Sequence, residues 1–123
     1  IEQFDRDSRA PRKVFDTICD FAANAGVIPG TVQMPPDALD LRWVGAVLEK
    51  NGVVEETGLA AGVLGHPAIG VAWLANKIAP YGEHLGAGDF VLSGSFTRPA
   101  TAVAGDCFRV DYGPLGVIEF RFV

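Results

Sequence analysis

The chain has 123 residues, enough for one domain with a modest core, and its 49% hydrophobic and 20% charged content is ordinary for a globular protein. Fifteen acidic and ten basic residues give a net charge of −5. This charge argues against nonspecific binding to nucleic acid and against an anionic membrane surface, and no apolar run is long enough to span a bilayer.

The first patterned segment is RKVFDTICDFAANAG, residues 12–26, which follows an expected loop at residues 1–11. Charged residues surround Phe15 and Ile18, and the segment ends in small residues. Buried elements rarely hold so many charges, whereas a solvated face does not need two large apolar side chains so close together. The pattern leaves two interpretations open, an amphipathic surface element or the wall of a polar pocket.

A β-hairpin is predicted after a connecting loop at residues 27–40, where prolines and a glycine exclude a continuous helix or central strand. Asn51-Gly52 lies between two β-rich runs and predicts strands at about residues 41–49 and 53–60. The adjacent Glu55 and Glu56 point to opposite faces of the second strand, so they do not form a carboxylate pair. We expect one to be exposed and the other to lie at the sheet edge.

The segment HPAIGVAWLANKIAPYG predicts a helix at about residues 67–79. Pro67 suits the first helical position and Pro80 ends the helix. Residues 68–75 are apolar on every side, so we expect this helix to be buried on most of its faces.

The remainder is predicted to be β. The tripeptide AGD occurs at residues 87–89 and 104–106, each time before an apolar run, which predicts turns leading into strands at about residues 90–96 and 107–112. GPLG then predicts another turn. The final VIEFRFV alternates between apolar and charged residues, as in a strand with one buried face.

The two cysteines, Cys19 and Cys107, are too few for a disulfide framework and have apolar neighbours. We therefore expect reduced thiols in the core of a cytoplasmic protein. The chain opens at Ile1 in the middle of a pattern, so we expect a portion of a longer protein, folded as a single domain over residues 1–123.

Lys13 and Thr17 are four residues apart, with Asp20 three residues further on. An ammonium and a hydroxyl brought together can hold an anionic oxygen, such as that of a carboxylate or an enolate, and Asp20 can orient a water. Solvated charges on an amphipathic element have the same spacing, so both interpretations stay open.

The segment SGSFTRP, residues 93–99, offers hydroxyl groups at Ser93, Ser95 and Thr97 directly after an apolar run. Hydroxyl and backbone N–H donors in such a loop can hold a carboxylate, and Arg98 offers a planar fork for a second one. A simple turn has the same composition.

His66 precedes the predicted helix, where it can cap backbone groups, and His84 lies in a glycine-rich loop. Neither has a second histidine or a cysteine at ligand spacing, so a histidine metal site is not favoured. A Ser–His–Asp arrangement stays open, although the chain has no G-x-S-x-G pattern.

Several segments resemble the C-terminal half of the fumarylacetoacetate hydrolase superfamily, namely KVFDT at 13–17, AANAG at 22–26, SGS at 93–95 and AGD at 104–106. Within it, LRWVGA, NGVVEETGLAAGVLGHPAIGVAWLANK and GSFTRP look most like the 2-oxohept-3-ene-1,7-dioate hydratases of homoprotocatechuate (4-hydroxyphenylacetate) breakdown. The 4-oxalocrotonate decarboxylases and 2-hydroxypentadienoate hydratases are similar but match these segments less well.

The resemblance implies a β-rich α/β fold, a mixed β-roll or barrel with peripheral helices. It also implies that residues 1–123 are the C-terminal catalytic portion of a longer hydratase. Exposed strand edges on a half-length chain lead us to expect a homo-oligomer.

The family's reaction uses a divalent metal, Mg²⁺ or Mn²⁺, which the 2-oxo acid end of the substrate chelates and which stabilises an enolate. Water then adds at C4 and gives 4-hydroxy-2-oxoheptanedioate. The family's metal ligands are an E-x-E pair and a third acid, which match positions upstream of Ile1, so no metal ligand is expected in this chain. The alternatives are a 4-oxalocrotonate-type decarboxylase on the same scaffold, and an inactive truncated domain without the metal ligands.

The resemblance also implies roles for single residues. It places Lys13 and Thr17 close to the metal and the substrate oxyanion, with Asp20 beside them. It favours the pocket-wall interpretation of residues 12–26, in which Phe15 and Ile18 anchor the segment in the core.

For the later segment, the resemblance places Ser95 against the substrate carboxylate, with Ser93 and Thr97 as its neighbours and Arg98 at the distal carboxylate. Phe21 stands where this branch usually has Asn, which we expect to reshape the pocket.

Overall fold

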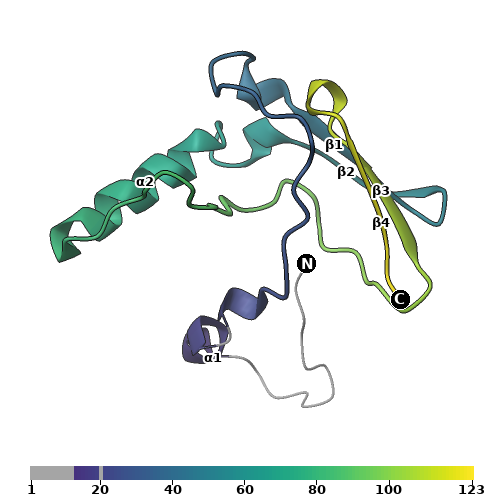
Figure 1. The fold of residues 1–123 in the computed structure, drawn as a ribbon, viewed down its shortest axis with the longest axis horizontal. Helices are drawn as coiled ribbons and strands as arrows, with labels where there is room; N and C mark the ends of the chain where they lie inside the picture. Colours follow the sequence, from purple (N-terminus) through teal and green to yellow (C-terminus); the bar gives the residue numbers. More distant parts are fainter. Residues whose placement is uncertain (1–12, 20) are drawn as a thin grey trace.

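The computed structural model describes residues 13–19 and 21–123, so the loop expected at residues 1–11 and the position of Asp20 lie outside the described residues. An open sheet, a long helix beside it and a short helix below make up the chain (Figure 1). The helices are α1 (Val14–Cys19) and α2 (Ala68–Ile78), and the strands are β1 (Gly45–Lys50), β2 (Val53–Leu59), β3 (Cys107–Asp111) and β4 (Val117–Arg121).

The predicted hairpin is confirmed by β1 and β2, which pair antiparallel around Asn51-Gly52. Asn51 (φ 52°) and Gly52 (φ 80°) are both left-handed, as a two-residue turn of type I′ requires. β1 begins later than predicted because Leu41–Trp43 forms a 3₁₀ turn. The Asp40 carboxylate caps this turn by accepting the backbone N–H of Arg42.

The strands have the order β2-β1-β3-β4, and every neighbouring pair is antiparallel. The described residues therefore form an open antiparallel sheet, and the finer expectation of a mixed β-roll or barrel is not confirmed by them. A short turn joins β3 to β4, and such connections give antiparallel pairs, while a sheet of four strands is too small to close on itself. β3 and β4 confirm the strands predicted after the second AGD and in VIEFRFV, with the predicted GPLG turn between them.

The strand predicted at residues 90–96 is not formed. Gly94 is left-handed (φ 109°), and the Ser95 hydroxyl bonds the backbone of Thr97. Such local side-chain bonds compete with strand pairing, so this segment crosses the sheet instead of joining it.

The sheet has an apolar inner face and a polar outer face, because successive residues of each strand point to opposite sides. Three phenylalanine rings pack together on the inner face with centroids 5.4 to 5.8 Å apart. This arrangement confirms the alternation predicted for VIEFRFV. The inner-face side chains of β1, β3, β4 and the residue pair after β4 include Leu48, Val110, Ile118, Phe108, Phe120 and Phe122.

Helix α2 confirms the position of the predicted helix but not its burial. None of its residues is buried, and Trp73 is 62% exposed. Figure 1 shows the reason, since α2 points away from the sheet and only the segment that follows it runs back along one side. No helix within residues 13–19 and 21–123 has the length and hydropathy that crossing a bilayer requires.

Two other burial predictions are wrong. Phe15 is 71% and Ile18 is 68% exposed, so neither anchors α1 in the core. Cys19 and Cys107 are free and exposed rather than buried. Cys107 is exposed because strand alternation puts its neighbour Phe108 on the inner face, and Cys19 because α1 lies away from the sheet.

The second AGD turn ties the hairpin to β3 through buried Asp106. Its carboxylate accepts Asn51 Nδ2 at 2.8 Å and the Val103 N–H at 2.9 Å, and lies 3.0 Å from Lys50 Nζ. These hydrogen bonds, with that of Asn51 as the largest cause, lower the pKa of Asp106 to about 2. Lys50 also donates to the carbonyl of Thr101, so the chain leading into β3 is held at several points.

Candidate functional site

Residues 93–98 lie across the inner face of the sheet, and Gly58 allows their close approach. A Cβ on Gly58 would overlap the carbonyl of Phe96, and a Cβ on Gly70 of α2 would lie 3.5 Å from the carbonyl oxygen of Ser93. The segment therefore lies between β2 and the start of α2. Its backbone position on β2 depends on the absence of a side chain at Gly58, whereas a Cβ at Gly70 would make an ordinary contact.

A cavity of about 160 Å³ lies between this segment and the sheet. Its floor is apolar, and its polar side-chain groups are the hydroxyls of Ser95 and Thr97 and the phenol of Tyr112. Drug-sized ligands fill cavities of about 300–1,000 Å³, so this hollow has the size for one end of a small acid. It is lined by Ala46, Leu48, Gly94, Ser95, Phe96, Thr97, Val110 and Tyr112.

The hydroxyl groups of the cavity are linked to one another. Ser95 Oγ donates to the Thr97 carbonyl at 2.8 Å, accepts the Thr97 N–H at 3.2 Å and lies 3.2 Å from Thr97 Oγ1. Burial raises the pKa of Tyr112, so its phenol stays protonated at neutral pH. Three O–H groups therefore line the same small hollow.

Arg98 follows this segment and pairs with Glu56 of β2. Arg98 Nε lies 2.9 Å from Glu56 Oε1, and the side chains are 84% and 17% exposed, respectively. The expectation of one exposed and one edge glutamate is confirmed, because Glu55 is exposed and Glu56 is the half-buried one on the outermost strand.

The structure groups some of the predicted site residues and separates others. Ser93, Ser95, Thr97 and Arg98 share one segment, whereas Lys13 is exposed at the start of α1, which lies apart from the sheet in Figure 1. Lys13 does not line the cavity. The same helix α1 includes Thr17, and Asp20 is outside the described residues.

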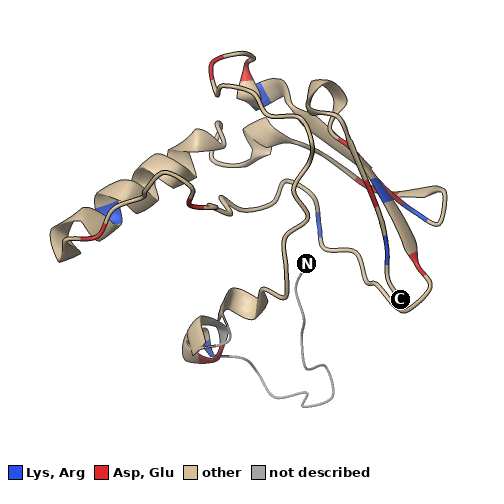
Figure 2. Ribbon diagram, viewed as in Figure 1, with Lys and Arg blue, Asp and Glu red and all other residues tan. Residues whose placement is uncertain are grey.

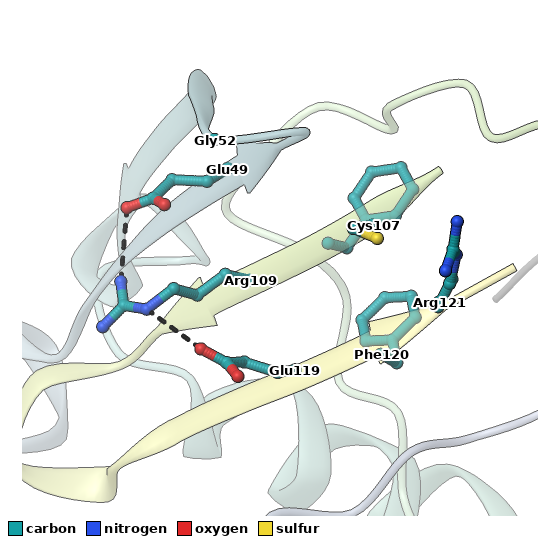
Figure 3. Close-up of a pocket in the computed structure, with 8 residues that line it drawn as sticks. Glu49, Gly52, Cys107, Arg109, Glu119, Phe120 and Arg121 are labelled. Carbon is teal, nitrogen blue, oxygen red and sulfur yellow. Dashed lines mark hydrogen bonds and ion pairs between the residues drawn. The ribbon is translucent and has the colours of Figure 1, made fainter. Parts of the chain in front are cut away.

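A second, open groove of about 470 Å³ lies on the outer face of the sheet (Figure 3). The Arg109 guanidinium lies in this groove among three carboxylates. Its Nη1 is 3.2 Å from Glu49 Oε1, its Nη2 is 3.0 Å from Asp111 Oδ2, and its Nε is 3.5 Å from Glu119 Oε1. The hydrogen bond to Asp111 is the main cause that raises the pKa of Arg109. Arg109 thus links carboxylates of three strands, and this row of charges stabilises the sheet surface.

The described residues offer no ready metal site. Within residues 13–19 and 21–123 there is no group of three or more His, Cys, Asp or Glu side chains that could hold a metal ion. His66 Nδ1 accepts the backbone N–H of Ala68 at 3.1 Å, so it caps the start of α2 as the sequence suggests.

Sequence reasoning missed two residues of the site. Tyr112 stands at the end of β3 directly before the GPLG turn, where a polar aromatic was a usable signal. Glu56 gave no signal, because its partner Arg98 is 42 positions away and only the folded chain brings the two together.

No protein-family model matches the chain. Among solved structures, 4-oxalocrotonate decarboxylase from Pseudomonas putida G7, complexed with magnesium and adipate, matches with a TM-score of 0.81 and 41% sequence identity. This match covers 87% of the chain and 41% of that structure. Over nearly all of its length the chain is similar to 2-oxo acid hydratases and decarboxylases of the family to which this enzyme belongs.

Within that family, 2-oxo-hept-4-ene-1,7-dioate hydratase of Escherichia coli is 63% identical over 119 residues, which are 97% of this chain and 45% of the relative. The 2-hydroxyhexa-2,4-dienoate hydratase of Comamonas testosteroni is 36% identical over 89% of this chain and 42% of the relative. The chain spans about half the length of the curated relatives it matches. The resemblance predicted from the sequence is confirmed at the level of this hydratase branch.

Proposed function

We propose that the protein containing this chain is a hydratase that adds water to a 2-oxoheptene-1,7-dioate in aromatic catabolism and forms 4-hydroxy-2-oxoheptanedioate. The observation that carries the proposal is 63% identity to the E. coli hydratase across 97% of the chain. Relatives named for monocarboxylic acids, such as 2-hydroxyhexa-2,4-dienoate hydratase and 2-keto-4-pentenoate hydratase, are only 30–36% identical. A dicarboxylic substrate is therefore favoured, and homoprotocatechuate breakdown is the pathway that we propose.

The position of the substrate double bond does not change the proposed product. The sequence led us to expect the 3-ene, whereas the relative is named for the 4-ene. Moving the double bond of a 2-oxo-4-ene to C3 conjugates it with the 2-oxo group. Water then adds at C4, the electrophilic end of the conjugated system, and both isomers give one hydroxy acid.

The proposed roles divide between two parts of the chain. The Thr97 hydroxyl donates to one substrate carboxylate, and the Ser95 hydroxyl does so after turning away from the Thr97 carbonyl, with Ser93 beside them. The cavity against the inner sheet face supports this role. Arg98 binds the distal carboxylate through its planar guanidinium. The phenol of Tyr112 is a further donor in the same cavity.

Lys13, Thr17 and Asp20 keep their proposed role at the substrate oxyanion, where an ammonium and a hydroxyl stabilise developing negative charge and a carboxylate orients the attacking water. In this structure α1 is not packed on the sheet. The proposal therefore requires the longer protein to bring α1 toward the cavity.

We propose that the longer protein uses Mg²⁺ or Mn²⁺, because solved relatives hold magnesium or calcium. The residues described here do not form a site for such an ion. Its ligands are expected upstream of Ile1, and none of the roles above is derived through the metal.

We also propose that residues 1–123 act as one domain of a cytoplasmic homo-oligomer. Free thiols at Cys19 and Cys107 support a reducing compartment. The apolar side chains exposed on α1 and α2 and the open sheet edges support association.

A 4-oxalocrotonate decarboxylase is the second candidate, favoured by the fold match to that enzyme. The test is to express the full-length protein that contains this chain and supply 2-oxohept-4-ene-1,7-dioate and 4-oxalocrotonate with Mg²⁺. We expect NMR to detect the 4-hydroxy product from the first acid. Release of CO₂ from the second acid without hydration of the first would reject the hydratase in favour of the decarboxylase.

The 123-residue chain should be assayed beside the full-length protein. The inactive-domain alternative predicts that the 123-residue chain has no turnover and does not bind Mg²⁺ by calorimetry.

A further inference from the structure

The Glu56–Arg98 ion pair is the starting point. A bulge between Leu48 and Glu49 skips Glu55 in the pairing of β1 with β2, so Glu56 pairs with Leu48 and shares its inner face. Glu56 is therefore directed toward the cavity side of the sheet, while its neighbour Glu55 stays exposed.

Two contacts on this face hold the segment that carries the proposed carboxylate donors. Phe96 lies against Gly58, and Arg98 pairs with Glu56. Gly58 and Glu56 are two residues apart on the same face of β2, and Phe96 and Arg98 are two residues apart in the opposite order. The segment therefore runs antiparallel along β2, and the ion pair with Glu56 fixes its end at Arg98.

The ion pair between Glu56 and Arg98 involves the Nε edge of the guanidinium. Glu56 Oε1 contacts Arg98 Nε at 2.9 Å, and the Arg98 side chain remains 84% exposed. Arginine carries five N–H donors in a rigid fork, so a partner at Nε leaves the donors of the two terminal nitrogens for a second acceptor. This end-on geometry suits a carboxylate that binds through both of its oxygens.

We propose that Glu56 is a positioning residue, which orients Arg98 so that the terminal nitrogens of the guanidinium bind the distal carboxylate of a dicarboxylic 2-oxo acid. This inference rests on the proposed function, and it assigns selectivity for a second carboxylate to a pair rather than to Arg98 alone. Without Glu56, a long and exposed arginine side chain samples many rotamers and loses part of its binding energy to ordering.

The test uses the full-length protein with two substrates, 2-oxohept-4-ene-1,7-dioate and 2-oxopent-4-enoate, which has no distal carboxylate. We expect Glu56→Gln and Glu56→Ala to raise KM for the dicarboxylate about tenfold with kcat nearly unchanged. The kcat/KM for the monocarboxylate should change less than about twofold. Glu55→Gln is the matched control, since it removes the adjacent exposed carboxylate. It should leave kcat and KM unchanged for both substrates.

Arg98→Ala separates this inference from the proposed function. We expect it to raise KM for the dicarboxylate, and Glu56→Gln added to Arg98→Ala should have no further effect. If Arg98→Ala has no effect, the proposed role of Arg98 is wrong. If Arg98→Ala raises KM and Glu56→Gln does not, the role of Arg98 stands and the positioning role of Glu56 is overturned.

Equal losses on both substrates, or a fall in Tm that accounts for the lost activity, would show that Glu56 is only structural and would overturn the inference. Adipate binding measured by calorimetry gives the same comparison without turnover. A wild-type protein that binds adipate no more tightly than pentanoate would also overturn it.

Discussion

At the scale of single residues, the candidate site differs from the rest of the sheet in how its donors are used. On the outer face, each nitrogen of the Arg109 guanidinium already lies near a carboxylate. On the inner face, Ser95 and Thr97 bond mainly to each other, and Arg98 has a single partner at Nε. Donors that are ordered but incompletely used can bind an anion with little reorganisation, which is why the inner face is the better candidate.

Lys13 provides a residue-scale prediction about catalysis. Because its charge is proposed to stabilise an oxyanion and its side chain is exposed, Lys13→Ala in the full-length protein should lower kcat about 100-fold with little change in Tm. Steady-state kinetics and thermal unfolding measure the two effects. Lys77→Ala, at an exposed position of α2, is the control, and parallel losses of activity and Tm in Lys13→Ala would argue against the catalytic role.

Asp106 provides a residue-scale prediction about pH. Its hydrogen bonds lower the pKa to about 2 in the folded chain, against about 3.9 in an unfolded one, so the unfolded state binds a proton first as the pH falls. The stability that Asp106 contributes is complete above about pH 5 and is lost progressively toward pH 2. We expect Asp106→Asn to flatten this part of the urea-unfolding profile, whereas Asp37→Asn in the exposed loop should not. An unchanged profile in Asp106→Asn would contradict the assignment.

At the scale of elements, the packing of residues 93–98 against β2 decides whether a cavity exists at all. The segment has no strand partner of its own, and its close approach depends on Gly58 of β2 and on local hydroxyl bonds. Helix α2 shows the converse case, an element whose sequence is apolar on all sides but whose residues find no core in this chain. Its ribbon carries one charged residue, Lys77, and is tan along the rest of its length in Figure 2.

Gly58 provides the element-scale prediction. Gly58→Ala forces the Phe96 carbonyl away from β2, and overpacking of this kind costs about 1–3 kcal/mol of unfolding free energy. Gly62→Ala is the control, because a Cβ there meets no atom within 4 Å, and it should change stability by less than about 0.5 kcal/mol. Urea unfolding of both variants measures the difference. Equal stabilities would show that the segment does not pack on β2.

At the scale of the whole molecule, the chain exposes more surface than an independent globular protein of its size. Its accessible surface is 9295 Å², whereas a monomer of 13.0 kDa exposes roughly 6,300 Å². None of the large side chains in the described part of the chain is fully buried. Exposed large apolar residues occur along most of the described chain, and those on the two helices are Val14, Phe15, Ile18, Ile69 and Trp73.

This surface leads to a prediction about association. Apolar patches of such extent are covered in stable proteins, so the 123-residue chain in isolation should sediment as a species heavier than 13.0 kDa. Analytical ultracentrifugation over a range of concentrations measures the mass. A monodisperse 13.0 kDa monomer at all concentrations would show that the exposed faces of α1 and α2 need no partner.

The sequence alone determined those features that depend on neighbouring residues. Asn51-Gly52 specifies a left-handed turn, Pro67 and Pro80 bracket α2, and VIEFRFV alternates with the period of a strand. Each of these needs only local backbone geometry. The serines, the threonine and the arginine of residues 93–98 were recognised as a group for the same reason.

Only the tertiary structure decided which surfaces meet. Burial of α2, the path of residues 93–98, the contribution of Tyr112 and the Glu56–Arg98 pair all depend on contacts between segments distant in sequence. An apolar pattern states that a residue favours burial, but whether burial occurs depends on the partner surface that the fold provides, because the free energy comes from area removed from water.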